Sequence, residues 1–260
     1  GHVSGVMTAG ISFPRFAGKW RHRSLVEAGD LVRHYLPGVR TPRRCVLLWR
    51  PRVGARLARR FQGRGVAGIS ATYRLPGVRR SLGISVPRGV GAPTTVIRCE
   101  ELAALGTKEF IGVGFAGSIS PEVHVGDVVV CDGAARDEGI SYHYAPAGVP
   151  AAPSTALNRW IQQTLRGAGL RFRVGPSWTT DAIYRETRTE LRHYQRSGFL
   201  TVDMEASALF IFGRVRRLPT ASVFVISDRL TEGKWKPEFH RVEPRLAEVA
   251  AAILRASLRS

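Results

Sequence analysis

The sequence has few cysteines and no long apolar run. No apolar segment approaches the roughly 18 residues that a membrane-spanning helix needs, and the first residues lack a charged segment followed by a hydrophobic one. We therefore expect a soluble, cytoplasmic protein. The cysteines Cys45, Cys99 and Cys131 have apolar neighbours and no CxxC spacing, which favours buried thiols in a reducing compartment over disulfides or metal ligands.

Lysine is also scarce, although the formal net charge is +19. Of the 39 basic residues only Lys19, Lys108, Lys234 and Lys236 are lysines, and the rest are arginines. The arginines spread along the whole chain, without zinc-ligand spacing, an aromatic RNA-binding motif or a basic arm. Coding bias explains this charge better than a specific nucleic-acid partner does. An arginine-rich surface is also compatible with phosphate-bearing ligands, because the guanidinium fork matches phosphate oxygens.

Strand-like and helical patterns alternate along the chain. Short apolar runs typical of buried strands occur at 45–48, 83–86, 109–113, 126–131, 200–202 and 221–226. Apolar residues recur with helical spacing after Pro93, at 157–165 and at 246–254. The alternation predicts an α/β fold, in which one domain at 41–260 has a central mixed, largely parallel sheet flanked by helices. Residues 1–40, rich in Pro, Gly and Arg, are expected to form an irregular N-terminal arm that wraps a neighbouring subunit.

A glycine-rich segment at 112–117 reads GVGFAG and fits the dinucleotide fingerprint GxGxxG after a strand. The fingerprint requires a helix whose first residues bind the pyrophosphate, but here residues 118–121 lead into another strand at 126–130. A nicotinamide cofactor is therefore not expected. Two alternatives remain, a turn that packing requires or a turn whose backbone amides face a ligand.

Two other segments are dense in hydrogen-bonding side chains. Residues 136–144 read RDEGISYHY after a buried strand, where the alternatives are a solvated turn and a ligand-binding loop. Residues 178–187 read WTTDAIYRET. In this second segment Trp178 and Tyr184 are suited to stacking on a flat base, while the Arg-Glu pair that follows Tyr184 could reach the edge of the base or hold the loop.

Carboxylates follow two further strands, in Asp203-Met204-Glu205 and in Ser227-Asp228. A carboxylate at the end of a buried strand is either a helix cap or a functional acid. Both alternatives stay open for each of these residues on their local sequence alone.

These segments together, in this order, resemble the nucleoside phosphorylase superfamily, which includes purine nucleoside phosphorylases, uridine phosphorylases and related nucleosidases. The resemblance extends from about position 40 to the C-terminus. It depends on GFAG at 114–117 followed by VGD at 125–127, TDAIYRET at 180–187, DMEASA at 203–208 and Ser227-Asp228. The RDEG-SYHY segment is most similar to a uridine-phosphorylase-like branch.

The resemblance implies a pentosyltransferase that cleaves the N-glycosidic bond of a purine or pyrimidine nucleoside with phosphate, giving free base and ribose 1-phosphate. Phosphate would be a co-substrate, and no metal or organic cofactor is implied. The implied roles are general acid for Asp228, ribose binding for Met204, Glu205 and Phe115, and base binding for Ala116, Gly117, Ile183 and Tyr184. A hydrolytic nucleosidase and a catalytically lapsed nucleoside-binding protein are the alternatives. Asp228 favours a purine and the branch favours a uridine-like substrate.

The phosphate-binding positions depart from the family pattern. The family has a GDPxR loop near the first strand, whereas residues 48–53 read LWRPRV here, and it often has arginine where Gly112 stands and serine or threonine where Phe115 stands. The resemblance therefore leaves two possibilities, water in place of phosphate or phosphate contacts from a substitute set that comprises Gly114, Arg50, Arg88 and Arg136, with Arg52 as a further candidate.

The family also completes each ribose site with a residue from a neighbouring subunit. This implies a homo-oligomer, such as a dimer, a trimer of dimers or a hexamer. His22 and His34 in the arm are the candidates for that residue.

Overall fold

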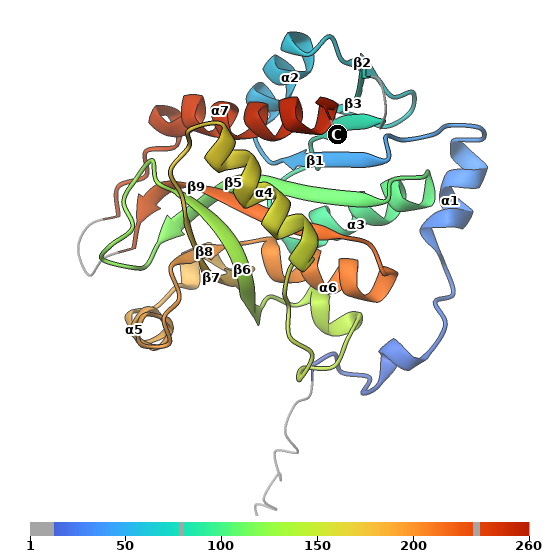
Figure 1. Ribbon diagram of the computed structural model, residues 1–260. Helices are drawn as coiled ribbons and strands as arrows, with labels where there is room; N and C mark the ends of the chain where they lie inside the picture. The colour runs from blue at the N-terminus through green and yellow to red at the C-terminus, as the bar shows by residue number, and fades with distance from the viewer. Residues whose placement is uncertain (1–12, 78–80, 231–234, 260) are drawn as a thin grey trace, which may run out of the picture.

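The computed structural model describes residues 13–77, 81–230 and 235–259 (Figure 1). These residues form a nine-stranded mixed sheet in the order β2-β3-β4-β1-β5-β8-β7-β6-β9. The strands are β1 (Arg44–Leu48), β2 (Arg64–Gly65), β3 (Thr72–Leu75), β4 (Leu82–Ser85), β5 (Glu109–Ser118), β6 (Val128–Asp137), β7 (Arg173–Thr180), β8 (Thr201–Asp203) and β9 (Thr220–Arg229).

The pairing of the strands confirms the predicted mixed, largely parallel sheet. Strand β1 runs parallel to β4 and β5, β5 runs parallel to β9, and β7 runs parallel to β6 and β8. Strand β9 also pairs with β6, so β5, β8, β7, β6 and β9 close into a ring. Because β1, β5 and β9 are parallel, their carboxyl ends meet at one edge, where α/β folds place ligands.

Helices cover both faces of the sheet, as Figure 1 shows with α2 and α7 above it and α3 and α6 below it. Val46 and Leu48 of β1 pack on the side of α2, α4 and α7, whereas Cys45 and Leu47 pack on the side of α1, α3 and α6. This alternation follows from the two-residue period of a strand. The helices are α1 (Ala28–Tyr35), α2 (Pro51–Arg60), α3 (Ala92–Ala104), α4 (Thr155–Gly167), α5 (Arg188–Arg196), α6 (Ala206–Arg216) and α7 (Phe239–Arg259).

The predicted strands correspond to β1, β4, β5, β6, β8 and β9, and the predicted helices correspond to α3, α4 and α7. The apolar patterns did not indicate β2, β3, β7, α1, α2, α5 and α6. Strand β7 contains Gly175 and Pro176, which interrupt the run of strand-forming residues. Helix α1 lies within the segment expected to be irregular, where Glu27 and Asp30 form a capping box and Val32 joins the core.

The glycine-rich segment at 112–117 is part of β5, so the expected turn is wrong. Its glycines serve close packing inside the sheet. A Cβ on Gly112 or Gly114 would lie 3.0 Å from the Trp49 ring, which is tighter than most Cβ contacts and would require the ring to shift. These glycines therefore make room for an indole.

The three cysteines are buried and free, as expected. Burial raises the pKa of the Cys45 thiol to about 12 and raises the pKa values of Cys99 and Cys131 well above the usual range. Among the described helices, none is both long enough and apolar enough to span a bilayer.

Candidate active site

A cavity of about 500 Å³ opens at the edge where β5, β8 and β9 end. It brings together every residue to which the sequence assigned a catalytic, ribose-binding or base-binding role. These are Phe115, Ala116, Gly117, Ile183, Tyr184, Met204, Glu205 and Asp228. Residues up to 113 positions apart in the chain therefore line one space, of a size typical for small-molecule sites.

Glu205 lies at the N-cap position of α6 and is only 7% exposed. Its Oε1 accepts a hydrogen bond of 2.6 Å from the backbone N–H of Gly91, which is itself the N-cap of α3. Burial, and then the nearby Asp203, raise the pKa of Glu205 to about 8. This carboxyl is therefore mostly protonated at neutral pH, so it can donate a hydrogen bond to a hydroxyl or accept one from it.

Asp203 has a different role from Glu205, although both belong to one motif. Its Oδ2 accepts from the backbone N–H groups of Glu205 and Ala206 at 2.8 and 2.7 Å, and its Oδ1 accepts from the hydroxyls of Ser177 and Thr179, both at 2.8 Å. Burial nevertheless raises its pKa. Of the two carboxylates in this motif, Asp203 is therefore the helix cap, and it holds Glu205 at the cavity. Glu205 remains the candidate functional acid.

Asp228 is 6% exposed and lies near the end of β9. Its Oδ1 accepts from the Ser227 hydroxyl at 2.6 Å, and its Oδ2 accepts from the indole N–H of Trp235 at 2.7 Å. A Cβ on Gly117 would lie 3.2 Å from Oδ2, so a residue without a side chain leaves space beside this carboxyl. Asp228 is thus oriented by two donors toward a surface that a ligand can reach.

Glu186 is a further carboxyl that lines the cavity, and the sequence had left its role open between base contact and loop support. Burial, and then the charge of Asp228, raise the pKa of Glu186 to about 7. Trp49, Val90, Trp235 and Phe239 also line the cavity. No motif identified Val90, Trp235 or Phe239, because each reads locally as an ordinary apolar position, and Trp49 was noted only as part of the departure at 48–53.

The proposed aromatic pair for base stacking does not form. Tyr184 lines the cavity and is 89% exposed. Trp178 is buried away from the cavity. Its indole stacks on the Tyr194 ring with the ring centroids 4.6 Å apart, and its N–H donates to Asp137 Oδ2 at 2.8 Å. Since alternate residues of a strand point to opposite faces, the position of Trp178 in β7 directs it into the core.

The RDEG-SYHY segment is neither a solvated turn nor part of the cavity lining. Glu138 is buried and accepts from the Ser207 hydroxyl at 2.8 Å and from the Ser141 backbone at 2.9 Å. Arg136 donates to the Ser141 hydroxyl and to three backbone carbonyls between residues 145 and 149. The hydrogen bond between Glu138 and Ser207 therefore ties this segment to the start of α6.

Comparison with known proteins gives the family. A model of the phosphorylase superfamily matches residues 71–259. The chain belongs to this superfamily. It is 29% identical over 148 residues to a guanosine phosphorylase of Halorubrum lacusprofundi (57% of this chain and 61% of that protein) and 30% identical over 179 residues to a uridine phosphorylase of Treponema pallidum (64% and 69%). The chain thus spans less than two thirds of the first relative's length.

Solved structures of the superfamily have the same fold. The structure of a uridine phosphorylase from Vibrio fischeri superposes with a TM-score of 0.70 at 27% identity and covers 82% of this chain and 89% of its own. A purine nucleoside phosphorylase from Toxoplasma gondii, in complex with immucillin-H, gives a TM-score of 0.74 at 20% identity, with coverage of 84% and 92%.

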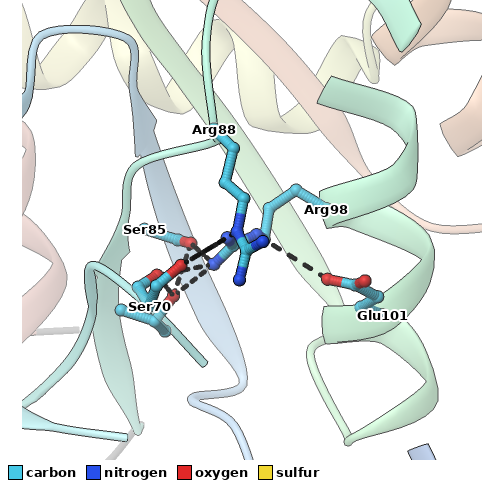
Figure 2. A network of polar contacts seen from close by, with 6 residues as sticks. Ser70, Ser85, Arg88, Arg98 and Glu101 are labelled. Atoms are coloured by element: carbon cyan, nitrogen blue, oxygen red, sulfur yellow. Dashed lines mark hydrogen bonds and ion pairs between the residues drawn. The ribbon is translucent and has the colours of Figure 1, made fainter. Parts of the chain in front are cut away.

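The substitute phosphate residues do not converge in this member of the superfamily. Arg50 lines the cavity but is ion-paired with Glu243, and Gly114 lies against the Trp49 ring. Arg136 uses its guanidinium on Ser141 and on the backbone of residues 145–149. Figure 2 shows Arg88 beside Arg98 and Ser70, and its Nε donates to the Ser70 hydroxyl at 3.3 Å. Neither Arg88 nor Arg136 lines the cavity.

His22 and His34, the candidates for completing a neighbour's ribose site, are both exposed and lie outside the cavity lining. Within the described ranges, no three His, Cys, Asp or Glu side chains gather closely enough to hold a metal ion.

Proposed function

We propose that this chain cleaves the N-glycosidic bond of a nucleoside and releases the free base. The observation that carries the proposal is one cavity of about 500 Å³ that contains Glu205 with Met204 in one wall and Asp228 in another. The names of the relatives, which are guanosine and uridine phosphorylases, support a nucleoside as the substrate.

The residues of the cavity suit the charges that this reaction develops. As the bond breaks, the ribosyl carbon gains positive charge and the departing base gains negative charge. Asp228, oriented by Ser227 and Trp235, would donate a proton to the base nitrogen. Glu205 would bind the ribose hydroxyls and, once ionised, stabilise the cationic ribosyl carbon. Met204 and Phe115 would pack on the sugar.

The second substrate takes one of two forms. The relatives named above are phosphorylases, which supports phosphate as the acceptor and ribose 1-phosphate as the product. Hydrolysis by water is the other form, and the surroundings of Trp49 favour it. In both forms the chain's own carboxyl groups perform the acid chemistry, so we propose that no cofactor takes part.

The test is base release from a panel of purine and pyrimidine ribonucleosides, with guanosine and uridine first. The full chain should release base from at least one of them, and Asp228→Ala should lower that rate. Glu248→Gln is the matched control, since Glu248 is an exposed carboxylate paired with Arg245 on α7. If no nucleoside is cleaved, or if both variants behave alike, the proposed function is refuted.

We also propose a cytoplasmic homo-oligomer. Several large apolar side chains of the N-terminal arm and α1 are exposed in the single chain, which supports burial against a second copy. They are Phe16, Leu25, Val26 and Tyr35. Three free, buried cysteines accord with a reducing compartment.

A further inference from the structure

The nucleoside cavity has two distinct ends along β5. At Gly117 the strand passes Asp228, whose Oδ2 would lie 3.2 Å from a Cβ at that position. At Gly114 and Gly112 the strand passes the Trp49 ring. Three residues of strand separate Gly114 from Gly117, which is about 10 Å at roughly 3.3 Å per residue. If Asp228 protonates the departing base, the group that attacks the ribosyl carbon from the opposite side arrives near Trp49.

The indole of Trp49 is fixed at this end. Trp49 is 8% exposed, and its N–H donates to the Thr95 hydroxyl at 2.9 Å. The Thr95 hydroxyl donates in turn to the Gly91 carbonyl at 2.9 Å, and the Gly91 N–H donates to Glu205. The indole is therefore linked through Thr95 to Gly91, the residue that holds the Glu205 carboxyl, and its only hydrogen-bond donor is already used.

The charges at this end do not suit an anion. Among the described residues that line the cavity, the cations are Arg50, Arg188 and Arg229. Arg188 and Arg229 come from the segments that carry Glu186 and Asp228, which leaves Arg50 near Trp49. Its guanidinium is ion-paired with Glu243 and lies 5.5 Å above the Phe115 ring.

Besides these arginines, the cavity lining carries carboxyl groups. Four of them line the cavity, on Glu186, Asp203, Glu205 and Asp228. A buried phosphate needs several charge-assisted donors to replace its hydration, whereas a water molecule needs none.

The geometry points to water as the ribosyl acceptor in this chain, with the Trp49 indole occupying the space in which a phosphate would have to bind. This inference rests on the proposed nucleoside cleavage. The oxygen of water forms a bond to the ribosyl carbon while the carbon–nitrogen bond breaks and its electron pair leaves with the base. Asp228 gives the base a proton, and the proton that water loses passes to solvent. The products are free ribose and free base.

The experiment separates the acceptor from the cleavage itself. The full chain is incubated with the nucleoside panel in phosphate-free buffer and in buffer with saturating phosphate, and the sugar product is identified. We expect ribose in both buffers, with rates that differ by less than about twofold. Ribose 1-phosphate, or a rate that rises at least about tenfold with phosphate, would overturn the inference while leaving the proposed function intact.

Arg50→Ala tests the remaining cation at this end, with Arg245→Ala as the matched control because Arg245 is also paired with a glutamate of α7 but lies outside the cavity lining. Whatever the rate of each variant, the sugar product should be ribose in both buffers. A phosphate-dependent activity that only Arg50→Ala abolishes would overturn the inference.

Direct titration with inorganic phosphate gives an answer that does not depend on turnover. We expect the full chain to show no saturable phosphate binding that is lost in the Arg50→Ala variant. Such binding would place phosphate beside Arg50 and overturn the inference, even if no nucleoside were cleaved and the proposed function had failed on its own assay.

Discussion

Replacing Asp228 gives the sharpest test of the site. The Ala variant removes a carboxyl that accepts from Ser227 at 2.6 Å and from Trp235 at 2.7 Å. Both donors have other partners, because Trp235 is 49% exposed to water and the Ser227 hydroxyl lies 3.4 Å from the Ala116 carbonyl. The free energy of unfolding should therefore fall by only about 1 kcal/mol.

The kinetic loss should be much larger than the loss of stability. A positioned general acid contributes roughly 10² to 10⁴ in rate, so kcat for a nucleoside with a poor leaving base should fall by that factor while KM changes much less. A substrate whose base leaves without protonation should largely escape the loss. Glu205→Ala should instead weaken binding of every ribosyl substrate, since the proposed contact of Glu205 with the sugar exists in ground and transition states alike.

The assay measures kcat and KM of both variants on one good and one poor leaving group, with thermal unfolding alongside. Asp228→Asn is the matched variant, because it keeps one acceptor for the neighbouring donors but cannot supply the acidic proton. It should reproduce the kinetic loss at nearly unchanged stability. If Asp228→Ala harms both substrates equally, Asp228 is a structural residue and the acid role is wrong.

Three further predictions concern pH, packing and assembly. The pKa of Glu205 rises from 4.5 to about 8 on folding, so the native chain holds this proton more tightly than the unfolded chain, and the melting temperature should fall as pH rises from 4.5 to 8. Glu205→Gln should flatten that slope, and an unchanged slope would contradict the burial argument. Gly112→Ala places a Cβ 3.0 Å from both Trp49 and Ser222 and should cost about 1–3 kcal/mol in urea unfolding, whereas Gly148→Ala, with no atom within 4 Å, should cost far less. Light scattering at assay concentration should show an oligomer, and a strict monomer would refute the proposed assembly.

The position of the site could be predicted because its residues stand where buried strands end. Met204 and Glu205 follow β8, and Asp228 lies near the end of β9. Although β8 runs antiparallel to β5, its last residues lie beside the carboxyl end of β5, which is parallel to β9. The local pattern did not show which of Asp203 and Glu205 is the helix cap and which is the candidate functional acid. That distinction depends on Ser177 and Thr179 of β7, which bond to Asp203, and β7 was not predicted because glycine and proline interrupt it.

A high density of hydrogen-bonding side chains in a segment did not predict that the segment lines the cavity. The RDEG-SYHY segment reads as a binding loop, but Arg136 and Glu138 use their hydrogen-bonding groups on nearby backbone and on Ser207. A sequence shows how many donors and acceptors a segment has, but whether they bond to each other depends on the path of the backbone.

The contact between Trp49 and β5 shows why the departures at the phosphate positions belong together. Trp49 follows β1 directly, and Leu47 and Leu48 pair with Gly112 and Val113 in parallel register, so continuing that register places Trp49 opposite Gly114. A large residue on one strand then requires a small one on the next, because the interior is close-packed. Glycine at 112 and 114 and tryptophan at 49 are therefore complementary, although 63 or more positions separate them. The glycines alone resemble a nucleotide-binding turn, and the tryptophan alone resembles a strand end. Together they make an apolar wall, and that wall, more than any single missing arginine, is the basis for proposing water as the acceptor.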